Sequence, residues 1–130
     1  MASIQPELWI DEARQAVEFY TVAFEAKVLH LVGDGEDVVA QLDVEGAVFW
    51  VVTADTNRRR LSPSAADGTT GRTLLVVDDP DQVHARAVAS GATLTSPVAD
   101  EHGWRLGRIV DPFGHHWEIG KPLEAWPHDA

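Results

Sequence analysis

The feature that most constrains this chain is an internal repetition, because the same order of predicted elements occurs twice within 130 residues. In the first half, residues 4–10 predict a strand, and residues 11–25 carry apolar side chains at helical spacing after Asp11, a candidate N-cap. Three further strands complete each half. Those expected strands are residues 27–32, 38–44 and 47–53 in the first half, and 93–98, 104–110 and 115–119 in the second.

The second half begins with a strand at residues 73–77 and continues with a helix that starts at Asp79-Pro80 and is closed by Gly91. The halves superpose with an offset of 67 positions, which aligns Trp50 with Trp117. A repeat of this kind indicates two copies of one βαβββ unit whose first and last strands supply equivalent positions.

The connection between the halves has no hydrophobic periodicity. We therefore expect a single domain of residues 1–130, with a first module at about 1–53, a linker at 54–71, a second module at about 72–120 and a tail at 121–130. The linker is expected to be a mobile connection between the halves, because connections of this length are usually functional lids or disordered segments. Its three consecutive arginines, residues 58–60, suit either a gate for an anionic ligand or a solvated basic tract.

Composition excludes several classes of function. The formal net charge of −11 repels nucleic acid and anionic lipid. The alternative is that the excess of acidic residues only keeps the protein soluble. The absence of cysteine excludes disulfides and thiolate chemistry. No apolar run is long enough to span a membrane, and the first residues lack a signal-peptide pattern, so a cytoplasmic protein is expected.

The stretch of residues 109–119 contains two apolar runs joined by Asp-Pro-Phe-Gly. Pro112 fixes its own φ and Gly114 tolerates a positive φ, so the pattern predicts a strand, a tight turn and a returning strand. Glu118 lies within the second apolar run. A carboxylate at such a position is either paired or functional, because burying it alone is costly.

This stretch, together with residues 16–20 (AVEFY) and Gly91-Ala92, resembles motifs of the vicinal oxygen chelate superfamily. Within that superfamily, its sequence is most similar to the PhnB-like branch. The superfamily includes glyoxalases, extradiol dioxygenases and bleomycin resistance proteins. The resemblance implies an α+β fold in which two pseudo-symmetric βαβββ modules form a curved sheet around a cup-shaped cavity. It also implies a homodimer.

In metal-dependent members of this superfamily, four side chains from the first and last strands of each half bind a divalent ion. Carried over by motif and offset, these positions are Gln5, Val51, Arg72 and Glu118. Valine has no donor atom and arginine carries a permanent positive charge, so we expect no metal, no cofactor and an ion pair between Arg72 and Glu118. His116 shares a strand face with Glu118 and leaves a two-ligand metal site as the alternative.

Strand alternation extends this set to a cup, with Trp50 and Trp117 directed into the core instead. The other histidines, His30, His84, His102 and His128, are expected at the surface or in loops, and His115 is expected to make a structural hydrogen bond. A catalytic histidine with a partner is the alternative for His102, which is next to Glu101. The expected ligand-binding residues of the cup are Gln5, Glu7, Trp9, Phe49, Val51, Arg72, Leu74, Trp104, Arg105, His116 and Glu118.

Three hypotheses of function follow from this lining. The first is a metal-free protein that sequesters or carries a small aromatic or cationic compound, similar to the bleomycin resistance branch and acting in antibiotic resistance. The second is an enzyme, either a glyoxalase-type lyase or isomerase or an extradiol-type dioxygenase, and the missing ligands count against it. The third is a structural dimer without a ligand, whose own side chains fill the cup.

Overall fold

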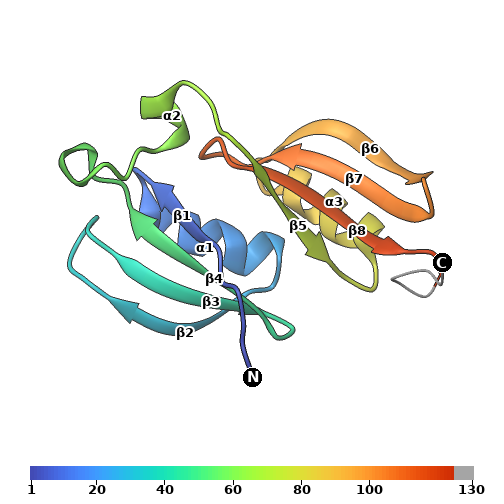
Figure 1. Cartoon of the computed structure of the whole chain (residues 1–130), viewed down its shortest axis with the longest axis horizontal. Helices are drawn as coiled ribbons and strands as arrows, with labels where there is room; N and C mark the ends of the chain where they lie inside the picture. Colours follow the sequence, from blue (N-terminus) through green and yellow to red (C-terminus); the bar gives the residue numbers. More distant parts are fainter. Residues whose placement is uncertain (125–130) are drawn as a thin grey trace.

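A computed structural model of the chain, described for residues 1–124, contains two modules of the same topology placed side by side (Figure 1). The first module comprises β1 (Glu7–Ile10), α1 (Ala13–Ala23), β2 (Lys27–Val32), β3 (Val39–Val44) and β4 (Ala47–Thr53). The second comprises β5 (Arg72–Val76), α3 (Pro80–Ala89), β6 (Thr93–Glu101), β7 (Trp104–Val110) and β8 (His116–Pro122). The predicted α+β fold with two βαβββ modules is confirmed.

Each module is a four-stranded sheet in which the first strand pairs with the last. The strand orders are β1-β4-β3-β2 and β5-β8-β7-β6, with β1 parallel to β4 and β5 parallel to β8. The remaining pairs are antiparallel. The first strand begins at Glu7 rather than residue 4, because Pro6 has no N–H to donate to a neighbouring strand.

The two long helices start differently. The α3 helix starts as predicted, with the Asp79 carboxylate accepting a hydrogen bond from the Gln82 N–H at 3.2 Å and Pro80 in the first turn. The α1 helix has Glu12 at its N-cap position without a side-chain cap, so the expected cap at Asp11 is wrong. The Asp11 carboxylate is occupied elsewhere.

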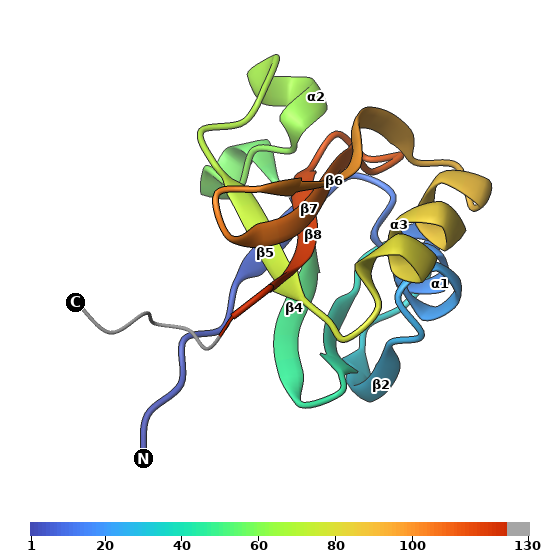
Figure 2. The ribbon, with the colours of Figure 1, turned by 90° about the vertical axis from the view of Figure 1, so that its right-hand side faces the viewer.

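The helices α1 and α3 lie next to each other on the same side of the two sheets (Figure 2). The ring of Tyr20, on α1, is fully buried and meets Phe49 of β4 edge-on at 5.3 Å and Trp117 of β8 at 5.6 Å between ring centroids. Phe49 and Trp117 are themselves edge-on at 5.5 Å. Aromatic rings from both modules therefore form one shared core.

A buried carboxylate joins the modules at this core. Asp111, which is 3% exposed, lies directly after β7 and accepts hydrogen bonds from the Tyr20 hydroxyl and from Trp117 Nε1 at 3.0 Å. Its other oxygen accepts from the backbone N–H groups of Phe113 and His115, each at 3.0 Å. Because four donors surround it, Asp111 tolerates burial that an unpaired carboxylate would not.

The connection between the modules contains two short stretches of regular structure, η1 (Thr56–Arg58) and α2 (Pro63–Ala66). Ser62 is 2% exposed and caps α2, accepting from the Ala65 N–H at 3.2 Å while donating to Asp11 at 2.7 Å. Pro63 packs against Gly114, where a Cβ atom would lie 2.8 Å from the Pro63 Cβ. The connection is thus anchored to both modules.

The end of the chain differs slightly from expectation, since β8 continues through Pro122 into the predicted tail. The remainder of the predicted tail, with His128, lies mostly outside the described residues. Within residues 1–124, no helix combines the length and the apolar character needed to cross a bilayer.

Candidate functional site

Glu118 lies in the middle of β8, on the sheet face turned away from the core, and two guanidinium groups bind its carboxylate. Arg72 Nη2 lies 3.3 Å from Glu118 Oε2, which confirms the ion pair predicted from the sequence. Arg108 Nε donates to the same oxygen at 3.0 Å, a contact that the sequence analysis missed. Arg108 is the cross-strand neighbour of Glu118, so pairing β7 with β8 through the predicted turn would have found it.

The first module carries a neutral cluster at the equivalent place. Trp50 Nε1 donates to Gln5 Oε1 at 2.8 Å, and Gln41 Nε2 donates to the same oxygen at 3.3 Å. Gln41 is the cross-strand neighbour of Trp50, just as Arg108 is of Glu118. The two halves therefore place different chemistry at matching positions, an amide and indole cluster in one and a cluster of charges in the other.

This match corrects the predicted pairing of Val51 with Glu118, because Trp50 holds the equivalent position. The offset of 67 is valid up to the turn before the last strand, but that turn differs in length between the halves. Residues 45–46 connect β3 to β4, whereas residues 112–114 separate Asp111 from His115 in the second module. One extra residue reverses the face on which every following side chain lies.

The same slip explains two errors in the predicted cup. Val51 is fully buried in the core, and Phe49 is 5% exposed and contacts Trp117, so neither lies on the outer face of the sheet. Trp50, predicted to be core, is on the outer face and partly exposed. Trp117 is 2% exposed and does lie in the core.

These four positions, Gln5, Trp50, Arg72 and Glu118, do not fit a divalent cation. The indole nitrogen of Trp50 has no free lone pair to donate to a metal. The guanidinium of Arg72 pairs with the Glu118 carboxylate, which a metal would need as a ligand. Within residues 1–124, no three His, Cys, Asp or Glu side chains lie close enough together to hold a metal. His116 and Glu118 consequently lack a third ligand in the described part of the chain.

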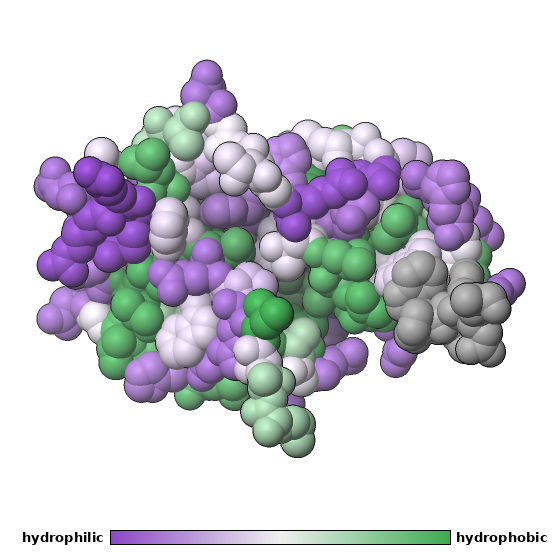
Figure 3. All heavy atoms as spheres, viewed as in Figure 1, coloured by the Kyte–Doolittle hydropathy of each residue, from purple (hydrophilic) through white to green (hydrophobic). Residues whose placement is uncertain are grey.

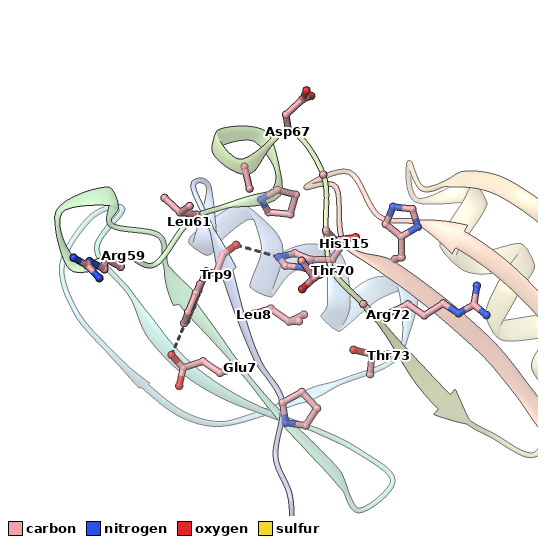
Figure 4. Close-up of a pocket in the computed structure, with 17 residues that line it drawn as sticks. Glu7, Leu8, Trp9, Arg59, Leu61, Asp67, Thr70, Arg72, Thr73 and His115 are labelled. Atoms are coloured by element: carbon pink, nitrogen blue, oxygen red, sulfur yellow. Dashed lines mark hydrogen bonds between the residues drawn. The ribbon is translucent and has the colours of Figure 1, made fainter.

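A cavity of about 700 Å³ lies between the modules. Its walls come from β1, the connection, the start of β5 and the turn before β8 (Figure 4). Four of the predicted cup residues line it, namely Glu7, Trp9, Arg72 and His116. The volume is in the range of pockets that enclose a drug-sized ligand.

Trp9 is fixed in this wall by contacts at both its ring and its backbone. Its Nε1 donates to Glu7 Oε1 at 2.9 Å, and its carbonyl oxygen lies 3.0 Å from His115 Nε2, which confirms the structural role expected for His115. In Figure 4 the ring stands between β1 and the connection. A partly exposed indole held in this way presents an aromatic surface at little cost in conformational entropy.

The three consecutive arginines separate into two kinds. Arg58 and Arg60 approach the Asp55 carboxylate at 3.6 and 4.0 Å, and Arg60 also donates to the Thr53 carbonyl at 3.4 Å. Arg59 instead lines the cavity, and within residues 1–124 its guanidinium has no hydrogen-bond or ion-pair partner. The tract is therefore neither wholly solvated nor wholly directed to a ligand.

The remaining predicted residues lie elsewhere. Gln5 and Leu74, with Phe49, border a second cavity of about 340 Å³ between the sheets. Trp104 is partly buried at the start of β7, beside Pro122 of β8. Among residues 1–124, the walls of these two cavities include neither Trp104 nor Arg105.

Arg105 faces α3, so its predicted place in the cup is wrong. Its Nε and Nη2 donate to the Asp81 carboxylate, both at 2.7 Å, and its Nη1 donates to Asp100 at 2.8 Å. The hydrogen bonds from Arg105 lower the pKa of Asp81, and those to Asp81 and Asp100 raise the pKa of Arg105. This group fixes α3 to its sheet at the surface.

His84 is the histidine whose placement the sequence analysis mistook. It is 5% exposed on α3, and its Nε2 donates to the carbonyl oxygens of Ser96 at 3.1 Å and Arg108 at 3.2 Å. Gly107 makes this possible, since a Cβ there would lie 2.6 Å from the His84 ring. A histidine buried against a glycine in a strand has a structural role.

Residues 3–119 match the model of the Glyoxalase/Bleomycin resistance protein/Dioxygenase superfamily. The uncharacterized protein Mb0911c of Mycobacterium bovis is 35% identical over 129 residues, covering 93% of this chain and 84% of the relative. The uncharacterized protein Rv0887c of Mycobacterium tuberculosis is also 35% identical over 129 residues, covering 93% and 75%.

Solved structures agree with the family model. TioX from Micromonospora sp. ML1 superposes with a TM-score of 0.74 at 25% identity, covering 95% of this chain and 100% of TioX. A mutant of the fosfomycin resistance protein FosX from Listeria monocytogenes, complexed with Mn(II) and a dihydroxypropylphosphonic acid, gives 0.71 at 14% identity and covers 97% and 93%. The second likeness concerns the fold alone. The chain belongs to the Glyoxalase/Bleomycin resistance protein/Dioxygenase superfamily, as the repeated βαβββ architecture and the extent of the match establish.

Proposed function

We propose that this protein is a metal-free member of its superfamily that binds and sequesters an aromatic small molecule. The observation that carries the proposal is the double ion pair of Glu118, whose carboxylate is held by Arg72 at 3.3 Å and Arg108 at 3.0 Å. A divalent ion at this position would have to displace both guanidinium groups and approach two fixed positive charges. We place the chain in the PhnB-like branch because of the sequence motif at residues 109–119.

The cavity between the modules supports binding rather than catalysis. Its volume of about 700 Å³ suits a ligand of drug size, and the fixed indole of Trp9 offers a stacking surface. The name of the superfamily includes bleomycin resistance proteins, and a role in antibiotic resistance by sequestration is the physiological part of this proposal. The FosX complex contains Mn(II), and the enzymatic alternative requires a comparable ion here.

The expected preference for a cationic ligand is not part of this proposal. Arg59 and Arg72 both line the cavity, and a cation placed there would meet them as well as the carboxylates of Glu7 and Asp67. Glu7 already accepts the Trp9 N–H. The aromatic part of the expected ligand is retained, because it depends on Trp9 alone.

We also propose that the protein is a homodimer that uses the outer faces of its two sheets. Exposed apolar side chains gather in the middle of this face (Figure 3), where Leu74 is 42% and Val76 52% exposed on β5. Exposed apolar patches in soluble proteins mark contact surfaces, and a second copy satisfies the closed symmetry that homo-oligomers prefer. Light scattering after size exclusion, at a protein concentration on the order of 100 μM, tests the oligomeric state. A monomer at that concentration would refute the homodimer.

Metal content tests the first part of the proposal. The protein is equilibrated with excess Mn(II), Zn(II) or Fe(II), passed through a desalting column and analysed for bound metal. We expect far less than one ion per chain, because the four positions do not form a ligand set. One tightly bound ion per chain, accompanied by turnover of a hemithioacetal or a catechol, would establish the enzymatic alternative instead.

Ligand binding tests the second part. Quenching of tryptophan fluorescence is measured with three planar probes of different charge: proflavine, 2-naphthamide and 2-naphthoate. We expect saturable quenching that is lost in Trp9→Ala and kept in Trp104→Phe, which removes an indole outside the cavity. Flat titrations with all three probes would refute the proposal and favour a structural dimer without a ligand.

A further inference from the structure

One cation in the wall of the large cavity is left without a partner. Arg59 lines the cavity, whereas its neighbours Arg58 and Arg60 both approach the Asp55 carboxylate. Within residues 1–124, no acceptor meets the Arg59 guanidinium. An uncompensated arginine beside an aromatic surface is the combination that recognises an anionic group on a planar molecule.

The turn around Arg59 fixes its place in the cavity wall. Asp55 and Arg60 form a two-way backbone bridge, with N···O distances of 2.8 and 2.9 Å, and the Asp55 side chain accepts from the Asn57 N–H at 3.0 Å. Arg59 lies within this closed loop with a φ of 61°, a left-handed conformation that few residues other than glycine adopt. The loop thereby separates Arg59 from Asp55, which its two neighbours use.

Within residues 1–124, no carboxylate of the cavity wall forms an ion pair with Arg59. Glu7 is engaged by Trp9 Nε1 at 2.9 Å, and in Figure 4 Asp67 points away from the other labelled residues. Arg72 adds a second cation that is half exposed, and its partner Glu118 is shared with Arg108. Since a guanidinium has five N–H donors, Arg72 retains donors for a ligand after this single contact.

We propose that the cavity selects planar aromatic compounds that carry an acidic group, with the ring against Trp9 and the acid on Arg59. This inference rests on the proposed function and deepens it by naming the class of ligand. The charge-assisted hydrogen bond to the acid supplies the selectivity, and the indole supplies affinity for any planar ring. Neutral analogues of the same shape therefore bind more weakly than the acids. Added salt reduces this difference in affinity, because it screens the charge of Arg59.

The experiment compares 2-naphthoate with its neutral isostere 2-naphthamide by isothermal titration calorimetry. In the unmodified protein we expect the acid to bind about tenfold more tightly than the amide. Arg59→Gln removes the cation while keeping a polar side chain of similar length, and it is expected to abolish this preference. Arg58→Gln is the matched control, because it removes a neighbouring charge that is paired with Asp55, and it should leave the preference intact.

The outcomes separate this inference from the function on which it rests. Equal affinity for the acid and the amide, with both lost in Trp9→Ala, overturns the charge preference and leaves the proposed function standing. A preference for the acid that survives in Arg59→Gln also overturns the assignment to Arg59. Failure of both probes to bind the unmodified protein overturns the inference, and it overturns the proposed function as well if proflavine also fails to bind. Thermal unfolding of each variant confirms that binding is compared between folded proteins.

Discussion

The hydroxyl of Tyr20 donates a hydrogen bond to Oδ2 of Asp111, although the two residues are 91 positions apart in the chain. The bond joins α1 of the first module to the turn between β7 and β8 of the second. Both side chains are buried, with Tyr20 fully enclosed and Asp111 3% exposed. This hydrogen bond therefore links the two modules through their shared buried core.

Tyr20→Phe tests the contact with the smallest possible change. Removing the hydroxyl leaves one oxygen of a buried carboxylate with fewer donors, so we expect a loss of about 1.5–3 kcal/mol in the free energy of unfolding. Urea unfolding followed by circular dichroism gives this value. Ser90→Ala is the control, since that hydroxyl only donates to the Arg86 carbonyl of its own helix at 2.8 Å, and a loss below about 0.5 kcal/mol is expected. Equal losses in the two variants would contradict the role assigned to Tyr20.

The pH dependence of stability offers a second test of the same residue. Burial, and then the charge of Asp111 and the hydrogen bond to it, raise the pKa of Tyr20 well above its ordinary value of 10.0. The folded state keeps a proton that the unfolded state releases above that pH, so stability is present below it and declines as the pH rises through it. The urea concentration at the midpoint of unfolding should decrease as the pH is raised from about 9 to 11. Tyr20→Phe should show a shallower decline, and identical slopes would refute the prediction.

The double ion pair of Glu118 predicts a distinct stability effect. In Glu118→Gln the carboxylate charge is lost while Arg72 and Arg108 remain close together, so we expect a loss of about 1–2 kcal/mol. Its control is Glu25→Gln, which removes the partner of Arg86 from a side chain that is 75% exposed. That change should cost less than about 0.5 kcal/mol, because exposed ion pairs contribute little. Comparable losses would indicate that Glu118 is no better coupled than a surface carboxylate.

Gly114 and Gly46 form a matched pair for testing how the connection is anchored. Both have positive φ angles, of 93° and 97°, so alanine introduces similar backbone strain at each, about 1 kcal/mol. Only at Gly114 does the added Cβ meet a neighbour, the Pro63 Cβ at 2.8 Å, whereas Gly46 has open space. We expect Gly114→Ala to lower the melting temperature more than Gly46→Ala. Limited proteolysis should also cut residues 54–71 faster in Gly114→Ala, and unchanged cleavage would count against the anchoring contact.

Local chemistry in the sequence was sufficient for the elements, and the resemblance to the superfamily led to one key contact. Helical spacing, the Asp79 cap and the turn glycines act over a few residues, and the helices and strands they predict are present. The Arg72–Glu118 pair was predictable because β5 and β8 are the first and last strands of one module, and the motif fixes their register. Arg59 could not be separated from its neighbours, because all three arginines lie in a segment without periodicity.

The face that each residue of β4 presents was decided only in three dimensions. Residues 47–52 are all apolar, so alternation carries no information about which side is buried, and the repeat offset was the only guide. A turn longer by one residue in the second module made that guide wrong by one position, so Trp50 rather than Val51 contacts Gln5. Likewise, Arg105 and His84 turn toward contacts with α3 and its sheet that local sequence does not encode. The sequence by itself determined the elements and their repetition, since these depend on local spacing, and its resemblance to the superfamily pointed to the ion pair of Glu118. Packing between sheets and helices decided which side chains face the cavity.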